Sequence, residues 1–167
     1  ISGNSAGANG ASVNECSLRT GSGWIAGTKV TVQVGANGKI YGAGGNGGAG
    51  GNVKDVADAN STGPNGLPYD ENGESGENGT SALGVQYNNT SIKVRSGGKI
   101  VSGFGGGGGG AAAFEGSIHP RGSAGGGGGG GAGSPAGVGG VKGDSSTSYS
   151  AQDGSDGSNG SVPNGGE

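Results

Sequence analysis

Two stretches of the chain alternate β-branched and polar residues, a pattern typical of a half-buried β-strand. The first covers residues 28–34 (Thr-Lys-Val-Thr-Val-Gln-Val) and the second covers residues 91–94 (Ser-Ile-Lys-Val). Each is followed by a glycine-containing turn and then by a shorter extended stretch, at 39–41 and at 99–101. Because the two copies match in register sixty positions apart, the sequence predicts a repeated strand–turn–strand unit.

Glycine dominates the rest of the chain, with 49 of 167 residues, against about 7% in an average soluble protein. Bare glycine runs are usually flexible linkers. Here, however, glycine recurs at every third position in several segments, and positions three apart share a face in a polyproline-II-type helix. A glycine face lets a second backbone approach closely. The amide groups of such a helix have no partners within it and must find them in neighbouring segments.

The predicted fold class is therefore irregular and mostly non-α: a polyglycine-II helix sandwich with a few short β-strands at its base. About six short helices are expected, at 42–51, 73–79, 103–110, 125–131, 137–143 and 154–160. Residues 105–110 and 125–131 are bare on all faces, so these helices are expected inside. Residues 73–79 and 154–160 carry side chains on two faces, so these helices are expected at the periphery. A collagen fold is disfavoured because the chain has only five prolines.

We expect one glycine-rich binding domain over residues 1–167, with a basal strand region at 1–41, a bundle at 42–160 and a tail at 161–167. If successive helices alternate in direction, the loops 52–72, 111–124 and 144–153 all lie at the end opposite the strands. A rigid scaffold with its distinctive residues on clustered loops is typical of a binding module. The candidate binding residues are Leu67, Pro68, Tyr69, Phe114, Glu115, Ile118, His119, Pro120, Arg121 and Tyr149.

Charge and candidate chemistry exclude several classes. The net charge of −3 gives no basic field for nucleic acid, and no apolar run is long enough to span a membrane. The single Cys16 excludes an internal disulfide framework. His119 has no nucleophile motif nearby, and the acidic residues lack calcium-loop spacing, so we expect no enzyme, metal or cofactor.

Trp24 is expected to pack between the strands. Without an initiator Met or a signal peptide, the chain has the character of a processed product or a fragment.

These glycine-rich motifs alternating with distinctive loops resemble the adhesins at the tips of T-even-type phage long tail fibres. Residues 21–27 (Gly-Ser-Gly-Trp-Ile-Ala-Gly) and 38–45 (Gly-Lys-Ile-Tyr-Gly-Ala-Gly-Gly) are also similar to the C-terminal tips of siphophage central tail fibres. The resemblance covers residues 21–160. It implies a layered polyglycine-II sandwich at the distal tip of a virion tail fibre. Its implied partners are the rest of the fibre and a bacterial outer-membrane protein, such as a β-barrel, or a surface glycan.

Two other function classes remain open from the sequence. An ice-binding antifreeze protein also uses short polyglycine-II bundles, but it needs a flat face of small residues and usually disulfides, whereas this chain has long, bulky loops. A structural glycine-rich matrix protein would have many uniform repeats, whereas this chain has one repeated strand unit and irregular loops.

Overall fold

The computed structural model describes residues 16–52, 72–115, 121–144 and 153–161. Within these residues the regular secondary structure consists of eight short strands and contains no helix. The strands are β1 (Cys16–Arg19), β2 (Val30–Val34), β3 (Lys39–Tyr41), β4 (Ser81–Gly84), β5 (Thr90–Val94), β6 (Lys99–Val101), β7 (Ala113–Glu115) and β8 (Arg121–Ser123). The expected sandwich of about six helices is therefore wrong as the fold class.

The strands form four separate pairs. Strand β2 pairs with β5 and β3 with β6, both in parallel, with Val34 opposite Val94 and Ile40 opposite Ile100. The two copies of the predicted strand repeat thus pair with each other at their sixty-residue offset, which confirms the repeat. Strand β1 pairs with β4 in parallel, and β7 pairs with β8 in antiparallel fashion.

A small apolar cluster holds the three parallel pairs together at one end of the molecule, which we call the base (residues 16–41 and 80–102). Val34, Ile40 and Ala82 are buried there, and partly buried side chains that include Leu18 and Ile100 pack around them. Trp24 is not part of this cluster, contrary to expectation. Its side chain is 48% exposed, and its indole N–H donates a hydrogen bond of 2.7 Å to the Thr20 carbonyl.

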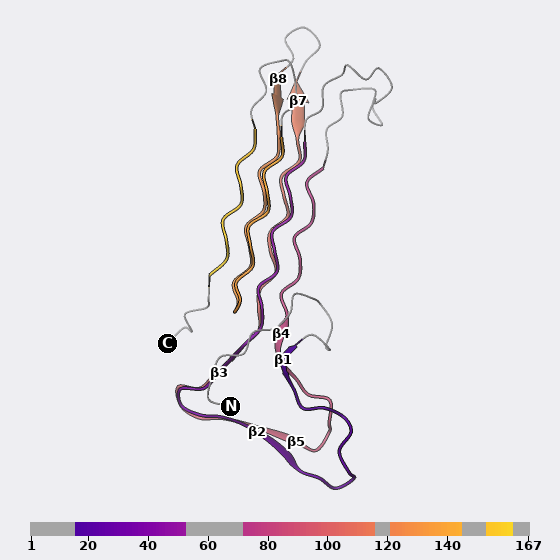
Figure 1. Ribbon diagram of the computed structural model, residues 1–167, viewed down its shortest axis with the longest axis vertical. Coiled ribbons are helices and arrows are strands. Elements are labelled where there is room, and N and C mark those ends of the chain that lie inside the picture. Colours follow the sequence, from indigo (N-terminus) through magenta and orange to yellow (C-terminus); the bar gives the residue numbers. More distant parts are fainter. Residues whose placement is uncertain (1–15, 53–71, 116–120, 145–152, 162–167) are drawn as a thin grey trace.

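Six glycine-rich segments run lengthwise, side by side, between the base and the β7–β8 pair (Figure 1). We name them segment I (42–51), II (72–80), III (103–112), IV (124–133), V (136–144) and VI (153–161). Their backbone amides donate to neighbouring segments; the Gly48 amide, for example, donates to the Gly107 carbonyl at 2.9 Å. An α-helix would need hydrogen bonds within one segment, whereas the amides of these segments donate to neighbouring segments instead.

Hydrogen bonds at every third residue arrange these segments in two rows. Segment I is bonded to II, III, IV and V, and segment IV is bonded to I, III, V and VI. The rows are therefore II–I–V and III–IV–VI, with I and IV at the centre. The expected interior position of 125–131 is confirmed, as are the peripheral positions of 73–79 and 154–160.

The expected interior position of residues 105–110 is wrong. This part of segment III bonds to I, II and IV, but its outer side is open. A Cβ built on Gly108 would find its nearest atom, the Glu74 carbonyl oxygen, at 3.5 Å, an ordinary van der Waals separation. Glycine at such positions permits close packing but does not require it, so a bare run need not be an interior one.

The registers of the hydrogen bonds fix the direction of each segment. Between segments I and II, the partners run from Ala43 with Thr80 to Ala49 with Glu74, so these segments are antiparallel. Between segments I and III, the partners run in the same direction, so these segments are parallel. Segments III and IV are antiparallel, whereas V is parallel to I and VI is parallel to IV. Successive segments therefore alternate in direction, as the sequence predicted.

Candidate functional site

The alternation brings three connections of the chain to one end of the segments. The Gly51 amide donates to Gly110, the Gly125 amide to Gly51 and the Gly143 amide to Gly125, each at 2.8–2.9 Å. The Gly154 amide donates in turn to Gly143 at 3.2 Å. Segments I, III, IV, V and VI thus meet here, and we call this the loop end. The described residues that flank the connections 53–71 and 145–152 in the sequence lie at this end, and the hairpin that flanks 116–120 extends from it.

A short hairpin extends segments III and IV at the loop end. Ala112 directly precedes β7 and Ala124 directly follows β8. Both are buried, and together they form a small apolar cluster. Beyond them β7 and β8 pair in antiparallel register, with Phe114 opposite Gly122 and Glu115 opposite Arg121. The structure therefore places three predicted site residues, Phe114, Glu115 and Arg121, on one hairpin (Figure 1).

The other candidate residues lie outside the described residues. They belong to the three connections that start from the loop end. They are Leu67, Pro68, Tyr69, Ile118, His119, Pro120 and Tyr149.

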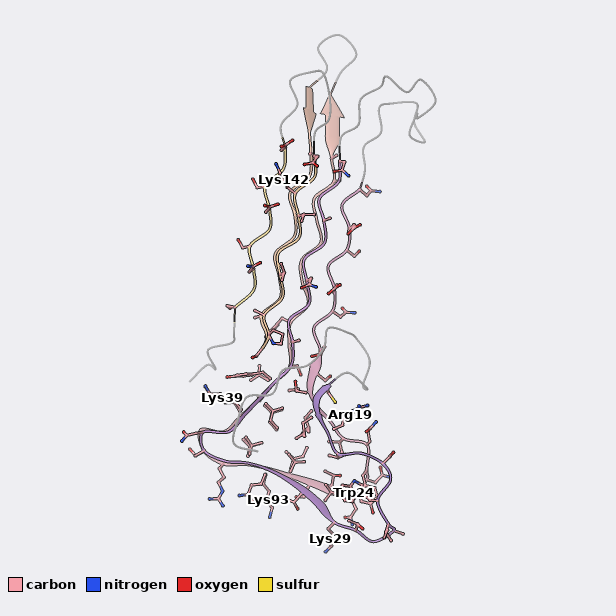
Figure 2. All side chains as sticks on the ribbon, in the orientation of Figure 1. Arg19, Trp24, Lys29, Lys39, Lys93 and Lys142 are labelled. Atoms are coloured by element: carbon pink, nitrogen blue, oxygen red, sulfur yellow. The ribbon has the colours of Figure 1, made fainter. Side chains whose placement is uncertain are left out.

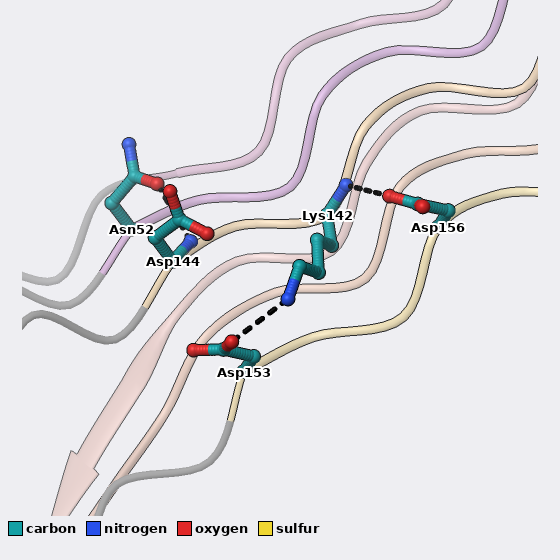
Figure 3. A network of polar contacts seen from close by, with 5 residues as sticks. All are labelled: Asn52, Lys142, Asp144, Asp153 and Asp156. Carbon is teal, nitrogen blue, oxygen red and sulfur yellow. Dashed lines mark hydrogen bonds and ion pairs between the residues drawn. The ribbon is translucent and has the colours of Figure 1, made fainter.

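A polar network fastens the segments just beneath the loop end (Figure 3). The Lys142 ammonium of segment V donates to Asp153 Oδ2 of segment VI at 2.8 Å, and the Lys142 amide donates to Asp156 Oδ1 at 2.8 Å. The Asp144 amide donates to Asn52 Oδ1 of segment I at 2.9 Å. This network fixes the ends of segments I, V and VI relative to one another, and therefore the points from which two connections emerge.

The hydrogen bond that the Lys142 ammonium donates to Asp153 is the main cause that raises the pKa of Lys142 above its ordinary value of 10.5, and the charge of Asp153 raises it further. Asp156 and Asn159 lie three positions apart on segment VI, so they share a face in an extended three-residue repeat; the sequence alone did not identify their partners. Both side chains accept backbone amides of segment V, from Lys142 and from Gly139. Their three-residue spacing was the signal that could have identified them.

One asparagine performs a similar task in the middle of segment I. The Asn46 side-chain amide donates to Glu77 Oε2 of segment II at 2.8 Å, and Asn46 Oδ1 accepts the Val138 amide of segment V at 2.9 Å. This side chain therefore links three segments across the outer face of one row.

The described residues contain no group of three His, Cys, Asp or Glu side chains placed to hold a metal ion. In the same part of the chain, no helix has the length and apolar character needed to cross a membrane. What the described loop end does offer is a hairpin and the ends of two longer connections on a hydrogen-bonded scaffold. This arrangement suits recognition of another macromolecule.

Comparison with known proteins gives one match. The family described as phage tail fibre adhesin Gp38 matches the chain over residues 3–167. No curated protein and no solved structure matches the chain.

Proposed function

Because the chain belongs to the phage tail fibre adhesin family, we propose that it occupies the distal tip of the fibre and binds a host outer-membrane protein through its loop end. An adhesin of a phage tail fibre is part of the virion tail and has two partners, a receptor on the host surface and the rest of the tail. In this proposal residues 1–167 form one receptor-binding domain. The base faces the fibre, and the loops 52–72, 111–124 and 144–153 are distal.

The alternating direction of the glycine segments is the observation that carries this proposal. It gathers three connections at one end, and the hairpin extends from segments III and IV among them. One side of a standard protein interface uses about 20–30 residues. The three connections and the hairpin together contain more residues than that. The opposite end consists of paired strands around the small apolar cluster, so the loop end is the one with room for a varied contact surface.

The residue types favour a protein receptor such as a β-barrel over a glycan. The hairpin region supplies an aromatic residue, an aliphatic residue and an arginine within eight positions: Phe114, Ile118 and Arg121. Aromatic residues and arginine near the centre of an interface are the commonest hot spots of protein–protein binding. Pro120 limits the freedom of the connecting residues and so lowers the ordering cost of binding.

The test measures how well the purified chain adsorbs to host cells and compares the wild type with the Phe114→Ala and Arg121→Ala variants. We expect each to weaken binding by about tenfold or more, as for a hot-spot truncation, with an unchanged melting temperature. Phe104→Ala is the matched control, because Phe104 is an exposed phenylalanine (60%) near the start of segment III, next to the base.

Normal adsorption by both folded hairpin variants would remove the hairpin from the site. The receptor class is tested with host strains that lack single outer-membrane proteins or carry truncated surface glycans. Loss of adsorption on deletion of one protein supports a protein receptor. Loss only on glycan truncation would replace it with a surface glycan.

A further inference from the structure

Among the described residues, the base carries charge of one sign only. Its residues include six cationic side chains and no Asp or Glu, although the whole chain has a net charge of −3. The cationic residues are Arg19, Lys29, Lys39, Lys93, Arg95 and Lys99. The acidic residues of the described chain belong instead to the glycine segments and the hairpin; they are Glu74, Glu77, Glu115, Asp144, Asp153 and Asp156. The molecule is therefore polarised along its length, with a cationic base.

Two of the cationic side chains lie at the end of the molecule farthest from the hairpin, whereas Arg19 and Lys39 lie nearer the glycine segments (Figure 2). Figure 2 shows Lys29 and Lys93 there, on the side of the β2–β5 pair that faces away from the glycine segments. Both residues are exposed. Lys39 and Lys99 are register partners in the β3–β6 pair, so their charges add at one place. A surface with several cations and no anion attracts an anionic partner over about a Debye length.

Exposed apolar side chains also occur on the base; those of Ile92 and Val94 lie on the face of β5 opposite to Lys93, because successive strand residues alternate faces. Trp24 is half exposed and Ile25 is 82% exposed. On strand β5, Ile92 and Val94 share a face and are both exposed, whereas Val34, the register partner of Val94, is fully buried in the apolar cluster. The apolar face of the β2–β5 pair thus continues from the cluster to the surface. Exposed aromatic and aliphatic side chains together with arginine are typical of protein interfaces.

The strand pairs themselves supply a simpler explanation for some of the lysines. Each sheet of the base has only two strands, and charged residues on open edges prevent unwanted strand pairing. Lysine is especially common in that role, so edge protection accounts for part of the positive charge. It does not account for Arg19 and Arg95, nor for the absence of an acidic residue among the described residues of the base.

We propose that the base is the docking surface for the tail fibre and that its partner there is an acidic protein surface with apolar patches. This inference rests on the proposed function, which directs the loop end to the host and leaves the opposite end for the fibre. Charge complementarity identifies the partner as acidic. Long-range attraction aligns the base with the fibre end, and the exposed apolar side chains Trp24 and Ile25 are then buried in the contact.

The experiment measures binding of the full chain to purified tail fibres assembled without the adhesin, at low and high NaCl. We expect the affinity to fall as salt rises from about 0.05 to 0.5 M, since screening shortens the range of the attraction. Lys29→Glu/Lys93→Glu is expected to weaken fibre binding by about tenfold or more, whereas Lys29→Arg/Lys93→Arg keeps the charge and the binding. Lys142→Gln, a change of an exposed lysine near the loop end, is the control and should bind as the wild type.

Fibre binding that is unchanged in a folded Lys29→Glu/Lys93→Glu variant would overturn the inference. So would loss of host-cell adsorption by this variant with intact fibre binding, because the cations would then face an anionic host glycan. The two proposals fail separately. Phe114→Ala reports on the loop end through adsorption of the free chain, and the double reversal reports on the base through binding to the fibre.

Discussion

Gly128 and Gly129 are neighbours in one glycine run, yet the structure gives them opposite tolerance for a side chain. A Cβ at residue 128 would come well within 3.0 Å of the Gly107 carbonyl oxygen, a separation that real Cβ atoms essentially never show. A Cβ at residue 129 would find its nearest atom, the Ser158 carbonyl oxygen, at 3.6 Å. The obstacle to Gly128→Ala is backbone, so segment IV must move away from segment III.

The cost of this movement follows from the hydrogen bonds between the two segments. The amides of Phe104, Gly107 and Gly110 donate across this contact, each at 2.8 Å. If each contributes about 1 kcal/mol net, their loss costs about 3 kcal/mol, which agrees with the upper range of about 1–3 kcal/mol for overpacking. Gly129→Ala disturbs none of them and reduces the freedom of the unfolded chain, which stabilises by about 0.4–1 kcal/mol. The two variants should therefore differ by about 3–4 kcal/mol.

The assay is equilibrium urea unfolding of the wild type and of both alanine variants. Gly106→Ala and Gly108→Ala repeat the comparison in segment III, because a Cβ at 106 meets the Asn46 carbonyl whereas one at 108 has 3.5 Å of space. If Gly128→Ala fails to fold, Gly129→Ala must still fold. Stabilities within about 0.5 kcal/mol of each other in both pairs, the ordinary scatter of surface substitutions, would refute the two-row packing.

Three further predictions follow from the same hydrogen bonds. In the run 105–110, the amides of Gly105 and Gly108 make no hydrogen bond in the described structure, so hydrogen exchange by NMR should be fast at these two and slow at the other four. Thr80→Val should destabilise by about 1–3 kcal/mol in urea unfolding, because its buried hydroxyl accepts a backbone amide at 2.8 Å; Thr80→Ser should retain most of the stability. The pKa of Lys142 is raised by its ion pair with Asp153, so the pair stabilises the folded state fully below pH 10.5 and loses this effect as pH rises through the folded-state pKa. The difference in unfolding free energy between the wild type and Lys142→Gln should therefore shrink at high pH.

Short-range patterns predicted the parts of the fold that depend on local sequence. The alternation around Val34 and its copy around Val94 predicted strands, and the matched spacing indicated that the two units are related. The structure adds that they pair directly with each other. The alternating direction of the segments was also predictable, because it follows from where the strand units enter the bundle.

Long-range contacts decided the features that the sequence did not predict. Strand β1 is short, contains Cys16 and Ser17, and is a strand because it finds β4 as its partner. Residues 42–51 lie at the centre of the bundle although Ala43, Asn46 and Ala49 are not glycine, because a segment needs glycine only on faces that meet another backbone. The three non-glycine positions face the side with room for a side chain, so counting bare faces could not rank the segments.

The candidate site was predictable as a region and not as a geometry. Alternation of the segments was enough to bring the loop containing Phe114 to the same end as the other connections. That this loop begins and ends as a hairpin, with Glu115 opposite Arg121, depends on a backbone pairing that glycine-rich flanking sequence does not specify. The network around Lys142 was missed because it joins side chains to backbone amides of another segment.

The way this chain is held together separates stability from recognition. In the segments, most of the stabilising hydrogen bonds run between backbones, and the main sequence requirement is glycine where a Cβ would meet a neighbouring carbonyl, as at Gly128. Among the described residues, this pattern joins one glycine segment to another, and the connection 53–71 lies in the sequence between Asn52 and Asn72, at the ends of segments I and II. Under the proposed function, a change of side chain in such a connection alters the surface offered to a receptor and leaves the described segment-to-segment hydrogen bonds unchanged. This is the physical reason to seek receptor specificity in the loops and to expect substitutions that destabilise the scaffold among the glycines.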